Sequence, residues 1–401
     1  MSAQTVSFPD IDYGCGSAHL RVGLYAQPSL RSALSSAPSG NVAIVASEPG
    51  IGMLVRLQSK PDRVEIMQVL PPPPGSGSMN PSSCSNGRGS FLAAASPRGN
   101  IVAIVYECTL KFYVPSSSSA TSSSAPPYYS LSDECTLYFK ITDVAISCAV
   151  ADDGQRGGGG AQYFVAAAGA NGVEIVKLID DGFGGVTLSK DDAVWPVCLA
   201  QTFHICSVSF SKSGDHLSMA TTDGRVGVWS TASISRIESP SAIWKTSLRE
   251  GRITRGVLFA QKNSSALCLG CVTWDGVLHV YKNISSSDAD PLSFQLAAMV
   301  HSENESNIAV QPDQARMRAP GLVAFSPDGT RAAISHGNIP NAISVVDIEG
   351  DDGPKAVRLV RIAEKKTTSP VWAVGLASIS EHVIVYDSAG TLHSFAWESI
   401  Q

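Results

Sequence analysis

The stretch ICSVSFSKSGDHLSMATTDGRVGVWS, which runs from Ile205 to Ser230, decides the fold. It contains three short runs rich in β-branched, aromatic and alternating apolar residues, at 205–210, 216–220 and 226–229. This pattern is typical of strands on a pleated surface. Ser213-Gly214 and Asp223-Gly224 separate the runs, and because glycine adopts positive φ without steric penalty, both pairs predict tight turns. The stretch therefore predicts a three-stranded antiparallel meander.

The same pattern recurs along the chain at a constant interval. The turn glycines Gly172, Gly224 and Gly276 are separated by 52 residues each time, since 224 − 172 and 276 − 224 are both 52. A fixed period of this size indicates a repeat architecture. Seven meanders can be assembled in this way, near residues 19–70, 91–141, 143–201, 203–247, 252–299, 320–363 and 371–397.

Two motifs carry a resemblance to a known family. V-S-F-S-x-x-G at residues 208–214, D-G-x-V-x-V-W at residues 223–229 and the phrase TWDGVLHVY at residues 273–281 resemble blades of WD-repeat β-propellers. The resemblance implies an all-β fold in which residues 1–401 form a single seven-bladed β-propeller of four-stranded antiparallel blades. For the first stretch taken alone, an unrelated pair of hairpins in a β-sandwich is the alternative.

The last meander is one strand short, and the family resemblance suggests how it is completed. Propellers of this family usually close when the N-terminal strand completes the last blade. Residues 4–8 have the length of a strand and no other partner, so we expect them beside residues 391–397, where they would cover two free sheet edges.

The family's hydrogen-bond network is only partly present. The resemblance implies that Asp223 and Trp229 belong to such a network, but the histidine expected before the first strand is missing. Asp275 is matched with Tyr281 instead of a tryptophan. We expect structural roles for two aromatic residues and three turn glycines: Trp229, Tyr281, Gly172, Gly224 and Gly276.

Composition excludes several classes of protein. Hydrophobic residues make up 44% of the chain and charged residues 16%, which argues against a coiled coil or a mostly disordered chain. The net charge of −6 gives no sign of the basic face of a direct nucleic-acid binder. No apolar run is long enough for a membrane helix. Residues 1–14 lack the apolar core of a secretory signal. The nine cysteines are an odd number, and without a secretory signal they are expected to be free thiols. We therefore expect a cytoplasmic or nuclear protein without membrane insertion.

Four segments are expected to be loops of low complexity. They are rich in Ser, Gly, Pro or polar residues and lie at residues 71–90, 115–130, 152–160 and 301–319. Such compositions cannot bury enough apolar surface to offset the entropy lost on ordering.

The chemistry-bearing residues do not form a catalytic pattern. None of the eight histidines has the spacing of a metal site or a catalytic triad, and no convergent set of Asp, Glu and His is evident at the ends of the first strands. Cys268 and Cys271 form a CxxC, but within a strand they point to opposite faces and cannot share a metal. We expect no catalytic residues, no metal and no cofactor.

Without a catalytic pattern, the function that we expect is that of a non-catalytic protein–protein interaction scaffold in a multiprotein complex. The links between blades and the turns between second and third strands share one face, here called the top face, and expected partner-binding residues on it are Trp195, Trp274, Trp372, Asp223 and Asp275. Each tryptophan could equally cap its own blade. We expect other proteins as partners and no homo-oligomer.

Two other functions stay open at this point. One is a propeller enzyme with an axial site. The other is a phosphoinositide-binding propeller, although the Phe-Arg-Arg-Gly stretch of the lipid-binding group that this chain resembles in size is absent and Arg249–Arg252 is the nearest sequence.

Overall fold

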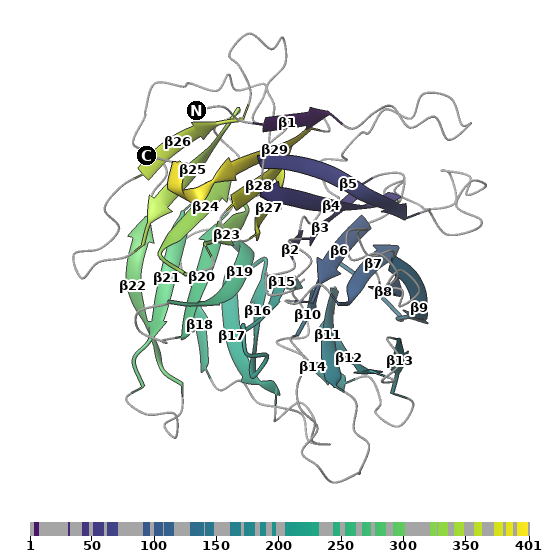
Figure 1. Cartoon of the computed structure of the whole chain (residues 1–401). Coiled ribbons are helices and arrows are strands. Elements are labelled where there is room, and N and C mark those ends of the chain that lie inside the picture. The colour runs from purple at the N-terminus through teal and green to yellow at the C-terminus, as the bar shows by residue number, and fades with distance from the viewer. Residues whose placement is uncertain are drawn as a thin grey trace, which may run out of the picture.

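The structure is a computed structural model in which almost every described element is a β-strand (Figure 1). It describes residues 4–7, 31–32, 42–47, 51–59, 62–70, 91–96, 100–106, 108–115, 129–139, 141–147, 161–169, 172–180, 185–189, 195–197, 205–231, 244–248, 253–261, 267–273, 277–285, 292–300, 321–326, 328–335, 341–348, 357–362, 373–379, 382–387 and 391–399.

Within these residues the strands pair into seven antiparallel sheets, numbered here in chain order. The first sheet is β2 (Arg31–Ser32), β3 (Val42–Ser47), β4 (Ile51–Ser59) and β5 (Asp62–Leu70). The second is β6 (Phe91–Ala95), β7 (Val102–Tyr106), β8 (Thr109–Pro115) and β9 (Tyr129–Thr136). The third is β10 (Asp143–Ile146), β11 (Gln162–Gly169), β12 (Gly172–Asp180) and β13 (Val186–Leu188), with β14 (Trp195–Val197) also paired to β12.

The remaining sheets follow the same up-and-down order. The fourth is β15 (Ile205–Phe210), β16 (His216–Thr221), β17 (Arg225–Ser230) and β18 (Trp244–Ser247). The fifth is β19 (Ile253–Ala260), β20 (Leu267–Thr273), β21 (Leu278–Asn283) and β22 (Phe294–Val300). The sixth is β23 (Val323–Phe325), β24 (Arg331–Ser335), β25 (Ala342–Asp347) and β26 (Val357–Arg361). The seventh contains β27 (Ala373–Ile379), β28 (His382–Asp387), β29 (Thr391–Ala396) and β1 (Gln4–Ser7), and a 3-10 turn follows at Trp397–Ser399.

The first strands of the seven sheets, here called the central strands, lie around the middle of the molecule (Figure 1). Each contacts the next in the order β2, β6, β10, β15, β19, β23 and β27, and β27 contacts β2. The outer strands lie at the periphery. Residues at the start of different central strands are therefore neighbours in space although far apart in the chain.

The N-terminal strand belongs to the last sheet. β1 pairs antiparallel with β29, with Gln4 opposite Ser394 and Ser7 opposite Thr391. The seventh sheet thus has the order β1-β29-β28-β27, in which both ends of the chain contribute strands.

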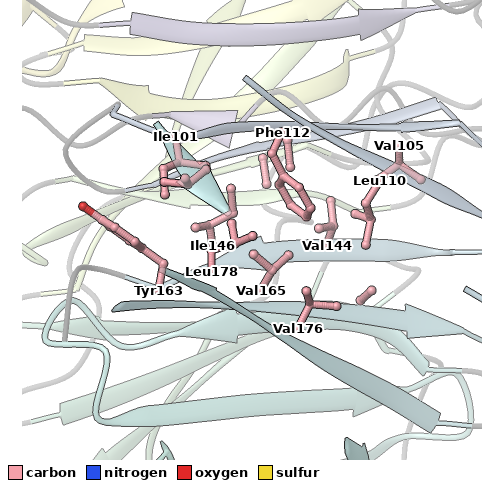
Figure 2. Close-up of a cluster of buried hydrophobic side chains, with 14 of the residues drawn as sticks. Ile101, Val105, Leu110, Phe112, Val144, Ile146, Tyr163, Val165, Val176 and Leu178 are labelled. Atoms are coloured by element: carbon pink, nitrogen blue, oxygen red, sulfur yellow. The ribbon is translucent and has the colours of Figure 1, made fainter. Parts of the chain in front are cut away.

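The apolar core lies between successive sheets. Figure 2 shows one cluster, in which Phe112 and Leu110 of the second sheet pack against Val144 and Val165 of the third. Further clusters join the third sheet to the fourth, the fourth to the fifth, the fifth to the sixth and the sixth to the seventh. Because these clusters cover the third to sixth sheets on both faces, the second and third strands of those sheets are buried along nearly their whole length.

The same pair of serine hydrogen bonds is repeated in four sheets. In each, the serine Oγ accepts a hydrogen bond from the backbone N–H at the start of the second strand, and the serine N–H donates to the carbonyl of that same residue. The pairs are Ser96 with Ile101, Ser147 with Phe164, Ser211 with His216 and Ser326 with Arg331. In the fourth and sixth sheets Gly214 and Gly329 follow with positive φ of 84° and 69°, which explains the Ser-x-x-Gly pattern.

One expected loop proves to be partly strand, and several other expected segments lie outside the residues that the structure describes. Residue 115 ends β8 and residues 129–130 start β9, so they belong to strands and not to the expected loop at 115–130. Arg31–Ser32 is the first strand of the first sheet, whereas residues 19–30, where the expected first meander begins, lie outside the described residues. The loops at 71–90, 152–160 and 301–319 also lie outside them.

Candidate functional site

Three polar side chains at the start of consecutive central strands make the same bridge. Each contacts one carbonyl of the second strand in its own sheet and one carbonyl in, or just before, the next central strand. Thr142 Oγ1 lies 3.2 Å from Ala168 O and 2.7 Å from Ile205 O; Cys206 Sγ lies 3.4 Å from Ala220 O and 3.2 Å from Ile253 O; Thr254 Oγ1 lies 3.1 Å from Val272 O and 2.6 Å from Gly321 O. The bridges connect the third, fourth, fifth and sixth sheets.

β-bulges aim two of these side chains. Ile205 pairs with Thr221 and Ser207 with Ala220, so Cys206 is an extra residue in the ladder. The same shift isolates Thr254 in β19. A bulged residue is released from the strand's regular alternation, and here its side chain reaches the neighbouring sheet.

The position after each bridge carries a second polar layer. Asp143, Ser207 and Arg255 hold this position in β10, β15 and β19. Asp143 Oδ1 lies 3.2 Å from Arg255 Nη1, and Asp143 Oδ2 accepts a hydrogen bond of 2.8 Å from the N–H of Val208. Ser207 Oγ donates to Gly256 O at 3.0 Å. Asp143, Ser207, Arg255 and the bridging Cys206 are here called the central polar cluster.

Burial controls the chemistry of this cluster. Asp143 is buried, and its charge is balanced by the guanidinium and the amide that contact it. Burial raises the pKa of the Cys206 thiol to about 12; the Asp143 carboxylate adds to the rise, while Arg255 opposes it. The thiol is therefore protonated at neutral pH and serves as a hydrogen-bond donor. It is not a nucleophile in this state, because nucleophilic attack requires the thiolate.

A second buried polar pair lies in the seventh sheet. His393 Nε2 is 2.7 Å from Asp387 Oδ2, and both side chains are buried. On the same sheet, Trp397 Nε1 donates to Ser378 Oγ at 3.2 Å. These contacts tie the end of β28 to β29 and the end of β29 to β27.

The structure describes only part of the partner-binding set expected on the top face. Asp223 lies in the turn between β16 and β17, where its carboxylate accepts a hydrogen bond from the Thr221 hydroxyl and lies 2.9 Å from Arg225 Nε. Trp195 is not in a link between sheets as expected: it belongs to β14, where it pairs with Ile175. Trp274, Trp372 and Asp275 lie outside the described residues.

The expected structural residues occupy ordered positions. Trp229 is 2% exposed and packs between the third and fourth sheets, and Tyr281 is buried between the fourth and fifth. Gly224 has a φ of 93° in the second turn of the fourth sheet, and Gly172 starts β12 opposite Gly169. Gly276 lies outside the described residues.

The two cysteines of the CxxC face opposite sides of β20, as expected. Cys268 packs in the cluster shared with the sixth sheet, and Cys271 in the cluster shared with the fourth. Burial raises the pKa of both thiols. In the described part of the chain, no group of three or more His, Cys, Asp and Glu is arranged to hold a metal ion. Nor does any helix described there have the length and apolar character needed to cross a membrane.

Sequence reasoning missed both buried polar pairs. Asp143 and Arg255 are 112 residues apart, so no local motif links them. Asp387 and His393 are six residues apart on adjacent strands, and a turn between them brings the two together. For the first pair, a usable signal was a charged residue directly before the apolar run of a first strand, Asp143 before Val144 and Arg255 before Gly256-Val257.

Comparison with solved structures shows the fold of WD-repeat β-propellers. The crystal structure of the Cps50 (Swd1) β-propeller domain of Myceliophteria thermophila matches with a TM-score of 0.57 and 13% identity, over 92% of this chain and 97% of that one. A chain of the crystal structure of the Mitotic Checkpoint Complex matches with a TM-score of 0.56 and 11% identity, over 98% of this chain and 90% of that one. Neither the protein-family models nor the curated proteins give a match.

Proposed function

We propose that this chain, which has the fold of the WD-repeat β-propellers, is a non-catalytic scaffold that holds other proteins of a multiprotein complex in fixed positions. The observation that carries the proposal is the set of bridges between central strands, in which side chains of Thr142, Cys206 and Thr254 tie four consecutive sheets together. Buried hydrogen bonds across sheet boundaries oppose movement of one sheet relative to the next. A rigid framework of this kind displays loops in constant geometry.

The architecture of the scaffold is part of the proposal. The seven sheets are the blades of one ring, and β1 closes that ring by completing the seventh blade. The cyclic order of contacts between central strands and the pairing of Gln4–Ser7 with β29 support this arrangement. A closed ring has no unpaired joint at which the sheets could separate.

The central polar cluster supports a structural rather than a catalytic role. Its carboxylate, guanidinium and hydroxyl are engaged with one another or with backbone groups, and its thiol is protonated. A nucleophile or general base needs a lone pair or a thiolate that is available to substrate. The cluster uses these groups to join sheets.

The solved relatives agree with this role. One is a β-propeller domain and the other is part of the Mitotic Checkpoint Complex, which is a multiprotein assembly by its name. For this chain we propose protein partners in the cytoplasm or nucleus, bound on the top face through Trp274, Trp372, Asp223 and Asp275.

Affinity purification of the tagged chain at its native level, followed by cross-linking mass spectrometry, tests the proposal. We expect a constant set of partners with cross-links to the top face, and we expect Trp274→Ala combined with Trp372→Ala to release them without changing thermal stability. Tyr138→Ala is the matched control, because Tyr138 is an aromatic residue with 100% exposure in the second sheet's periphery. Elution of the native chain as a monomer without stoichiometric partners would refute the scaffold.

A further inference from the structure

The outer strand of the fifth sheet exposes apolar side chains. Among the described residues, five large hydrophobic side chains are exposed, and three of them, Ile284, Leu296 and Met299, lie on β22 or next to the end of β21. Leu296 is 48% exposed and Met299 is 45% exposed. β22 is the last strand in the order β19-β20-β21-β22, so its outer edge has no partner strand among the described residues.

β22 also lacks the charges that protect sheet edges. Of the described outer strands with five or more residues, β5 contains Asp62, Arg63 and Glu65, β9 contains Asp133 and Glu134, and β26 contains Arg358 and Arg361. The seven residues of β22, FQLAAMV, contain none. Charged side chains on edge strands prevent pairing with other chains, and an uncharged edge permits it.

A bulge gathers the apolar side chains on one face. Tyr281 pairs with Leu296 and Val280 with Ala298, so Ala297 is the extra residue. Leu296 and Met299 therefore lie opposite Tyr281 and His279, which are two residues apart in β21 and share a face. Without the bulge, two residues three positions apart would face opposite sides.

The same face is held in place by aromatic contacts. The ring of Trp244 lies 5.5 Å from Tyr281 and 5.0 Å from Phe294, centroid to centroid, and these residues join the fourth sheet to the fifth. The start of β22 is thus anchored, and Leu296 and Met299 continue the apolar strip from the buried Phe294 toward solvent. A fixed strand edge loses little conformational entropy when another strand pairs with it.

We propose that β22 is a docking edge for an extended, uncharged segment of a partner protein that adds to the fifth sheet as a further strand. Main-chain hydrogen bonds to β22 provide the pairing, and apolar side chains at alternate positions of the segment contact Leu296 and Met299. An uncharged segment fits because a charge on it would be desolvated beside these side chains without a counter-charge in β22. This inference rests on the proposed scaffold function and names one kind of partner surface.

The test uses the full-length chain and a defined probe, a fluorescein-labelled peptide of seven alternating threonine and valine residues on a Gly-Ser linker. Fluorescence anisotropy should show binding to the unaltered chain. The double variant Leu296→Lys, Met299→Lys should weaken the Kd by at least about tenfold, because it charges the edge. Leu131→Lys is the matched control, since Leu131 is 49% exposed on the outer strand β9, and it should leave the Kd unchanged.

Further measurements test how the probe binds and provide a second variant in case the first does not fold. A probe with N-methyl groups on alternate backbone nitrogens should lose binding, because it cannot complete the ladder. If the double variant unfolds, Ala297→Lys at the exposed bulge replaces it, with the same expected direction. Equal binding to the unaltered and edge variants, or absence of binding, would overturn the docking edge. Sedimentation that shows a dimer lost in Leu296→Lys would overturn it in favour of a second copy of this chain.

The outcomes separate this inference from the scaffold proposal. If the chain still elutes with its partners and the probe does not bind, the docking edge is wrong and the scaffold stands. If native purification yields no partners, the scaffold itself is wrong.

Discussion

Arg255 Nη1 lies 3.2 Å from Asp143 Oδ1, and this contact joins two central strands, β19 and β10, between which β15 runs. The two residues are 112 positions apart in the chain. The second oxygen of Asp143 binds the backbone of β15 at Val208, so one carboxylate touches three consecutive sheets. The Asp143–Arg255 pair therefore helps to hold the third, fourth and fifth sheets together at the centre of the molecule.

Removal of either charge should destabilise the protein strongly. Asp143→Ala leaves the mostly buried guanidinium without this carboxylate, and Arg255→Met removes the guanidinium from the buried carboxylate. We expect each single change to cost about 3–5 kcal/mol, because an unpaired buried charge remains. Urea denaturation of the purified chain measures the loss.

The double variant Asp143→Leu, Arg255→Met should lose much less than the sum of the single changes, since no charge is left unpaired. Additive losses would show that the two side chains do not act as a pair.

Trp229→Ala should cost about 3–5 kcal/mol. The indole is 2% exposed and packs between the third and fourth sheets, so truncation leaves a large cavity. Thermal and urea denaturation provide the measurement. A loss below about 1 kcal/mol would place the ring on the surface.

Gly227→Ala should be destabilising in a way that depends on Trp229. A Cβ at Gly227 would lie 2.4 Å from Cη2 of the Trp229 ring, which covers the glycine in the same strand. We expect a loss of about 1–3 kcal/mol from this overpacking. In the Trp229→Ala background the clash is gone, so the same alanine should cost far less; an equal cost in both backgrounds would contradict the contact.

Stability should fall in alkaline solution. The pKa of Cys206 is raised from 9.0 to about 12 in the folded chain, mainly by burial. Between these values the unfolded chain releases the thiol proton and the folded chain keeps it, so the free energy of unfolding decreases as pH rises above 9. Urea midpoints at pH 8 and pH 10 should show the decrease.

Cys206→Thr isolates the contribution of this thiol. Threonine is the residue at the two equivalent bridges, Thr142 and Thr254, and it does not titrate in this range. The variant should lose less stability between pH 8 and pH 10 than the unaltered chain. An identical pH dependence would assign the effect to other groups.

Deletion of residues 1–10 should lower the thermal midpoint and promote aggregation. β1 pairs with β29, and its removal exposes the edge of a strand whose neighbours are buried. Thermal unfolding and light scattering of the deletion beside the full chain are the measurements. An unchanged midpoint with a monodisperse product would show that the seventh sheet does not need this strand.

Much of the fold was predictable because its signals are local. Alternation within six residues and the Ser-x-x-Gly turn lie inside single hairpins, so the first three strands of the fourth sheet agree with the expected residues 205–210, 216–220 and 226–229 to within one residue. The opposite faces of Cys268 and Cys271 follow from the same alternation. The outer strands were harder, as Tyr129–Thr136 shows, because they are half exposed and alternate weakly.

The sequence by itself determined the all-β character of this protein, the turn residues and the repetition of meanders, since strand period and turn chemistry are properties of neighbouring residues. Only the tertiary structure decided which polar residues meet. The Asp143–Arg255 pair, the bridges from Thr142, Cys206 and Thr254, and the apolar edge of β22 all depend on how sheets pack and where one bulge shifts a register. A contact between distant strands depends on the packing of every sheet between them, and no local pattern encodes it.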